Sequence, residues 1–210
     1  MGKIPEGIVG PVYGRVAHVI GSSRNGVAYL KGPYKKQRKP SLGAEAANQT
    51  KFKMAHLWLQ PLLKFIRVGY LIYKKSSGAY NAAKSNLLLN AFEDGPDGAF
   101  INPAKVKVSV GSLPLPNDIK IELTEDNVFN FFWDPSIMEG THRDDQVMLL
   151  VYDAESKFAY GTPTGQFRHT GSDNMPIHPE KGATYHTYIA FNSADRTKQS
   201  DSVYLGAFSF

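Results

Sequence analysis

The chain has 210 residues, of which 42% are hydrophobic and 12% aromatic, so it is long and apolar enough to fold around a sizeable core. It contains no cysteine and no run of 18 apolar residues, which excludes disulfides, thiol chemistry, cysteine zinc sites and a membrane-spanning helix. Residues 1–105 carry 16 Lys/Arg against 5 Asp/Glu, whereas residues 106–210 carry 8 against 14. We therefore predict a basic region over 1–105 and an acidic region over 106–210.

The N-terminal segment is rich in glycine and β-branched residues. Residues 15–20 and 27–30 are predicted to pair as a β-hairpin, because Asn25-Gly26 between them tolerates the positive φ of a tight turn. A two-stranded hairpin is only marginally stable alone, so it must pack on this chain or on another one.

A basic stretch follows between Lys31 and Pro40, and its prolines disfavour a helix. It is either a solvated linker or an arm that grips phosphates, with Tyr34 stacking on a base. If the arm and the next helix bind a partner or nucleic acid, the candidate residues are Lys31, Tyr34, Lys35, Lys36, Arg38, Lys39, Lys51 and Lys53.

Two helices are predicted next. From about residue 44 to Ile66, apolar residues recur every three or four positions, and Pro61 should kink or split this helix. A second helix should run from residue 76 or 77 to near Phe92 and end in an acidic, glycine-rich turn. The spacing in that turn does not match an EF-hand calcium loop.

The acidic region changes to the period-two alternation of β-strands, separated by short turns. Seven antiparallel strands are predicted, and the fold class is α+β: an N-terminal hairpin with two or three helices, followed by a seven-stranded β-sandwich. The predicted strands are residues 106–110, 119–123, 128–133, 147–152, 166–170, 184–191 and 202–208.

Two family resemblances accompany these patterns. Residues 128–135, 182–191 and 200–205 resemble the second, sixth and seventh strands of a fibronectin type III domain, which implies an immunoglobulin-like fold for residues 106–210. The whole chain is also similar to a family of unknown function that is widespread in Bacteroidota, a resemblance that implies no activity. Its matching segments are residues 1–4, 7–10, 14–16, 19–23 leading to Gly26, 47–52, 59–62, 80–83 and 202–206.

Motifs of known enzyme classes are missing. The chain has no H-E-x-x-H zinc helix, no P-loop, no dinucleotide fingerprint and no G-x-S-x-G elbow. Asp144 and Asp145 form either a divalent-cation pair or part of a polar loop, and His178 and His186 flank a turn and could meet in space. We predict no enzyme activity, no catalytic residue, no cofactor and no metal.

The function predicted from these features is that of a structural or interaction protein. It would assemble with itself or dock on another protein through its basic half, as a subunit of a phage-like or filament-like particle, and without a signal peptide it would be cytoplasmic as synthesised. The alternative is sequence-independent nucleic-acid binding by the basic arm. A third possibility, carbohydrate binding, requires an exposed aromatic such as Trp133, which the strand alternation points inward.

Overall fold

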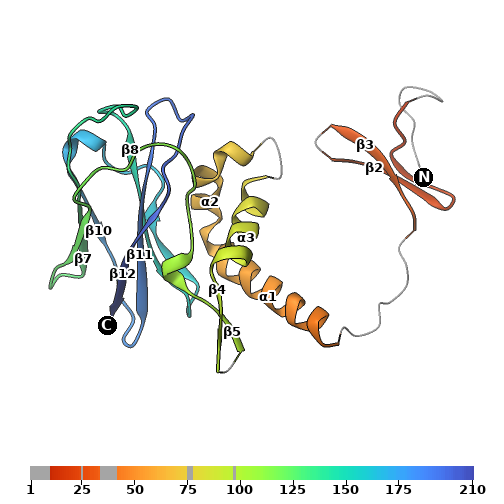
Figure 1. Ribbon diagram of the computed structural model, residues 1–210, viewed down its shortest axis with the longest axis horizontal. Helices are drawn as coiled ribbons and strands as arrows, with labels where there is room; N and C mark the ends of the chain where they lie inside the picture. The colour runs from red at the N-terminus through yellow and green to blue at the C-terminus, as the bar shows by residue number, and fades with distance from the viewer. Residues whose placement is uncertain (1–9, 25, 34–41, 75–77, 97) are drawn as a thin grey trace. The chain divides into compact units, whose positions relative to one another are not determined.

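The computed structural model describes residues 10–24, 26–33, 42–74, 78–96 and 98–210. The chain divides into two compact units, with the boundary between Ala46 and Ala47 (Figure 1). The boundary predicted between residues 105 and 106 falls within the second unit. The helices that precede this position share a hydrophobic core with the strands that follow it.

The N-terminal unit contains one antiparallel sheet of three strands: β1 (Gly14–Val16), β2 (Val19–Arg24) and β3 (Val27–Lys31), in that order. The strand predicted over residues 15–20 is divided, because the chain turns at Ala17, whose φ is 49°. The turn predicted between the last two strands is present, and Gly26 has a φ of 82° there.

Helices form one layer of the second unit. α1 (Ala44–Leu59), which begins just before the boundary, leads through a 3₁₀ turn containing Pro61 into α2 (Leu63–Gly69), as the predicted kink requires. α3 (Ala79–Asn90) lies beside α2, and the start predicted for it falls outside the described residues. A hairpin of β4 (Phe92–Gly95) and β5 (Gly98–Ile101) follows α3.

Two further antiparallel sheets complete this unit. One has the order β10-β7-β6, from β6 (Lys120–Leu123), β7 (Val128–Phe132) and β10 (Ser172–Pro176). The other has the order β12-β11-β8-β9, and its strands are β8 (Gln146–Asp153), β9 (Phe158–Thr162), β11 (Thr184–Asn192) and β12 (Val203–Ser209).

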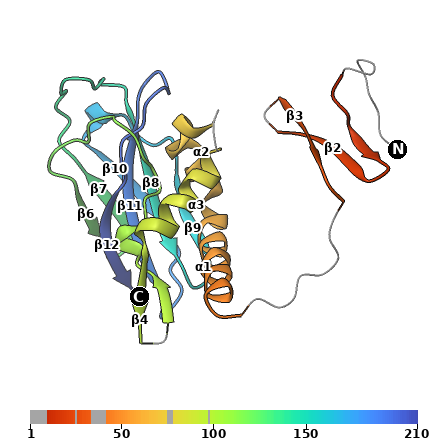
Figure 2. The same cartoon turned by 45° about the vertical axis from the view of Figure 1, so that its right-hand side comes forward.

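The four-stranded sheet is the middle layer of the unit, as Figure 2 shows. Side chains that alternate along β8 belong to two different cores. Met148 and Leu150 pack with the helices, whereas Val147 and Leu149 pack with the β10-β7-β6 sheet. The β10-β7-β6 sheet therefore packs one of its faces against the four-stranded sheet. The helices pack against the opposite face of the four-stranded sheet and not against the β10-β7-β6 sheet.

Two predicted strands are wrong. Residues 106–110 form no strand: they run as irregular buried chain, and the Val108 N–H donates to Ser202 Oγ at 2.9 Å instead of to a neighbouring strand. Residues 166–170 contain a 3₁₀ turn instead of a strand. The buried Arg168 side chain of this segment forms an ion pair with Asp145, at a distance of 3.3 Å between Nε and Oδ2. Strands β9 and β10 were not predicted. The mixed α+β class is confirmed, and no helix among the described residues is long and apolar enough to cross a membrane.

Candidate functional site

The N-terminal sheet has one face that carries all of its charge. Directly opposed residues of an antiparallel pair point to the same face, and successive residues of a strand point to opposite faces. The pairs Arg15–Ile20 and Ile20–Lys31 therefore share a face with the pair Arg24–Val27. We call it the cationic face, and it consists of Arg15, Ile20, Ser22, Arg24, Val27, Tyr29 and Lys31.

The opposite face is uncharged. It consists of small and apolar residues: Gly14, Val16, Val19, Gly21, Ser23, Ala28 and Leu30. Gly21 is the only buried residue in the described part of the N-terminal unit, and a Cβ there would collide with the carbonyl oxygen of Val12. The apolar side chains remain open, with Leu30 62% and Val16 47% exposed. The sheet thus has no core of its own on either face.

The predicted binding residues are divided between the two units. Lys31 ends β3 on the cationic face, where the structure adds Arg15 and Arg24, two cations that the sequence analysis did not select. Strand alternation was the signal that could have found them. Tyr34, Lys35, Lys36, Arg38 and Lys39 lie outside the described residues.

Lys51 and Lys53 lie on α1, in the second unit. Lys53 is exposed. The Lys51 ammonium lies 3.4 Å from Asp94 Oδ1 and 5.7 Å from the centroid of the Phe92 ring, so its charge is already partly matched within its own unit. Lys53 is therefore the better placed of the two to meet a partner.

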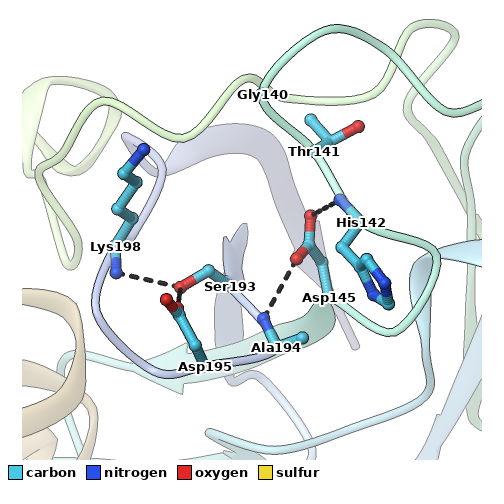
Figure 3. A pocket seen from close by; sticks show the side chains of 8 residues that line it. All are labelled: Gly140, Thr141, His142, Asp145, Ser193, Ala194, Asp195 and Lys198. Carbon is cyan, nitrogen blue, oxygen red and sulfur yellow. Dashed lines mark hydrogen bonds between the residues drawn. The ribbon is translucent and has the colours of Figure 1, made fainter.

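Asp145, one of the two aspartates considered as ligands of a divalent cation, connects three loops through hydrogen bonds and an ion pair. It is 1% exposed, and its carboxylate accepts hydrogen bonds from the backbone N–H groups of His142 at 2.9 Å and Ala194 at 3.0 Å (Figure 3). Arg168 Nε lies 3.3 Å from the same carboxylate. With its oxygens occupied by these donors, Asp145 has a structural role.

Asp144 is half exposed and lies between two imidazoles. Its carboxylate oxygens are 3.6 Å from His142 Nδ1 and 3.7 Å from His169 Nδ1. Within the described residues, no group of three or more His, Asp or Glu side chains is placed to hold a metal ion. The contacts of Asp144 are those of an exposed loop.

The other candidates from the sequence also have structural partners. His186 Nδ1 lies 3.1 Å from the hydroxyl of Tyr204, and burial lowers the pKa of this imidazole. The His178 carbonyl accepts a hydrogen bond from Tyr160, so His178 and His186 are held by different partners. Trp133 is 4% exposed and points inward, as predicted, and its Nε1 donates to the Arg168 carbonyl at 2.7 Å.

A hollow of about 300 Å³ opens beside Asp145 (Figure 3). It is lined in part by a tight turn in which the Asp195 carboxylate accepts hydrogen bonds from the Ser193 hydroxyl, the Thr197 N–H and the Thr197 hydroxyl. These donors lower the pKa of Asp195 from 3.8 to about 2. The residues that line the hollow are Gly140, Thr141, His142, Asp145, Ser193, Ala194, Asp195 and Lys198.

The Asp195 turn predicts a dependence of stability on pH. Because the folded-state pKa lies below the ordinary value, ionised Asp195 stabilises the fold above about pH 4, and this contribution disappears as the pH falls through about 2. We expect Asp195→Asn to lower the urea midpoint near neutral pH, and the gap to wild type to close in acid. Asp126→Asn, in the exposed β6–β7 turn, is the control and should produce no such gap. A gap that is constant between about pH 6 and pH 2 would contradict the assignment.

Comparison with known proteins adds a family but no activity. None of the curated proteins matches the chain, and none of the solved structures does. One family model matches residues 11–206, which is nearly the whole length and includes the N-terminal sheet, the helices and both C-terminal sheets. The resemblance of the whole chain to a family of unknown function is therefore confirmed, and this chain belongs to the family of unknown function DUF6266.

Proposed function

We propose that this protein is a non-enzymatic structural protein that assembles with further copies of itself through its basic N-terminal half. A subunit of a phage-like or filament-like particle would have this character. The observation that supports it most is the sheet β1-β2-β3, which exposes apolar side chains on both faces and buries only Gly21 among its described residues.

Such a sheet is not expected to be stable in water by itself. A small sheet becomes stable when one of its apolar faces is removed from water, and each Å² of apolar surface removed in this way contributes about 25 cal/mol. Its outer strands β1 and β3 each pair with β2 alone among the described strands. Unpaired edges of this kind invite pairing with another chain. A neighbouring copy would supply the missing cover.

The two C-terminal sheets support the same proposal, since we infer that they form an immunoglobulin-like β-sandwich. Named A, B, C, C′, E, F and G in chain order, with no strand D among the described residues, the strands β6 to β12 have the orders E-B-A and G-F-C-C′. Immunoglobulin domains likewise divide strands A, B and E from strands C, F and G. Domains of this architecture often serve as repeated building blocks, which is an analogy at the level of fold.

Light scattering coupled to size-exclusion chromatography tests the proposal on the full chain. We expect protein-only assemblies larger than a monomer, with an absorbance ratio at 260 and 280 nm typical of protein alone. Leu30→Asp, which places a charge on the uncharged face, should shift the protein toward monomers. Leu89→Asp is the matched control, because Leu89 is 79% exposed on α3, in the other unit. A monomeric wild type at all concentrations would overturn the proposal.

The cationic face favours one alternative, sequence-independent nucleic-acid binding. Arg15, Arg24 and Lys31 share this face, and none of them has a carboxylate partner among the described residues. Binding through these residues and the arm would weaken steeply with salt, by about one unit of logarithmic slope for each phosphate contact. Nucleic acid that elutes with the protein at low salt and is lost at high salt would support this alternative.

A further inference from the structure

We propose that the outer face of the β10-β7-β6 sheet is the surface that receives the cationic face of a second copy. This inference rests on the proposed self-assembly and names the contact that would produce it. The contact joins two different surfaces of the same chain. Repetition of such a head-to-tail contact gives rings or open filaments, depending on the rotation between neighbouring copies.

The outer face of this sheet is left uncovered by the rest of its unit. Figures 1 and 2 show the helices on the far side of the other sheet. The registers Lys120–Phe132–Ser172 and Glu122–Asn130–Asn174 run across the three strands. These residues alternate with the buried Phe129, Phe131 and Met175, so they point outward.

An aromatic ring, that of Phe132 at the end of β7, lies at one end of this outer face within an acidic rim. Phe132 is 38% exposed in a hollow of about 440 Å³. The hollow is also lined by three carboxylates, from Asp118, Glu122 and Asp134, and by one cation, Lys120. No ion pair among the described residues uses these carboxylates.

Asp134 accepts hydrogen bonds within its own loop beside the hollow. Hydrogen bonds from the Ser136 hydroxyl and the Ser136 N–H lower the pKa of Asp134. With three carboxylates against one ammonium, the hollow attracts a cation at long range and offers it a ring at short range. A guanidinium can stack on an aromatic face while it donates hydrogen bonds to carboxylates beside the ring.

The cationic face has the complementary properties. Arg15, Arg24 and Lys31 supply positive charge, and Val27 and Tyr29 supply apolar surface beside them. Val27 is 69% exposed and Tyr29 43% exposed, so both side chains are open to a partner. A positive sheet face with exposed apolar side chains therefore matches an acidic hollow with an exposed ring, which favours a defined orientation as well as attraction.

A charge-swap experiment tests the contact by light scattering of the full chain after nuclease treatment. Arg24→Glu or Glu122→Lys alone should raise the concentration at which half of the protein is assembled by about tenfold or more, because like charges then meet in the contact. The combination of both substitutions in one chain should restore assembly toward the wild-type level. Lys157→Glu and Glu155→Lys, both in the exposed β8–β9 turn, are controls of the same charge change outside both faces.

The outcomes separate the two proposals. If wild type assembles and both single variants assemble equally well, the contact is wrong while the self-assembly proposal stands. If the single variants fail but the combined variant is not restored, the pairing of these two faces is also wrong. If nuclease treatment alone dissolves the assemblies, nucleic acid joins the copies and the inference is overturned. A wild type that is monomeric throughout overturns self-assembly itself.

Discussion

Arg168→Ala is expected to lower the free energy of unfolding by about 3–5 kcal/mol, because it leaves a buried carboxylate without its cation. Arg168 is completely buried, and its Nη2 donates to the Pro114 carbonyl at 2.7 Å. Its guanidinium carbon lies 4.8 Å from the centroid of the Phe191 ring. Asp145 would keep two backbone donors but lose the only cation that lies near it in the described structure.

Urea unfolding followed by circular dichroism measures this effect. Arg143→Ala is the matched control, since the Arg143 side chain is 62% exposed and such surface changes are usually within about 0.5 kcal/mol. The double variant Arg168→Met with Asp145→Asn removes both charges and should recover part of the loss. A loss for Arg168→Ala no larger than that for Arg143→Ala would show that the buried pair does not hold these loops.

Gly161→Ala is expected to have the second large effect, about 2–5 kcal/mol, from backbone strain and a steric clash together. Gly161 has a φ of 149°, which L-residues rarely adopt. A Cβ there would also approach Cζ of Phe65 to 2.8 Å and collide with the carbonyl oxygen of Leu149. Since Phe65 comes from α2, the substitution would force the helix layer away from β9.

Gly182→Ala separates the two causes. Gly182 also has a positive φ, 83°, but no atom lies within 4 Å of a Cβ placed there. It should therefore cost only the conformational term, about 1–2 kcal/mol. Equal losses at the two positions, measured by thermal or urea unfolding, would show that the approach of Phe65 to β9 is not a close one.

The fold could be predicted from the sequence where local rules and burial agree. Pro61 interrupts the first helix as expected, and the strands at 128–132 and 184–192 follow clear patterns of apolar residues. The prediction failed where backbone groups are satisfied by distant side chains. The alternation of residues around Val108 predicts a strand, but the Val108 N–H donates its hydrogen bond to the Ser202 hydroxyl. No pattern in the local sequence indicates that partner.

The candidate site was predictable only in part for a similar reason. The basic arm is visible as a run of cations, yet the cationic face arises from pairing among three short strands that bring Arg15, Arg24 and Lys31 to one side. Arg168 was missed because a single arginine among polar residues looks like a surface residue. Its burial depends on Asp145, which lies 23 positions earlier in the chain.

Strand β8 has a consequence for how the protein finds its register. Because both faces of this strand are buried, a slip of one residue would exchange one apolar set for another and would cost less hydrophobic energy than in a half-exposed strand. The polar groups at its end make the difference. Tyr152 donates to the Trp58 carbonyl at 3.1 Å, and Asp153 accepts from the Glu155 N–H at 2.9 Å and the Ser156 hydroxyl at 2.6 Å. A slipped strand would lose the bond to Trp58, which belongs to another element, whereas the two Asp153 bonds lie within the β8–β9 turn and would move with it. The Tyr152–Trp58 contact therefore helps to select the native alignment of the central strand.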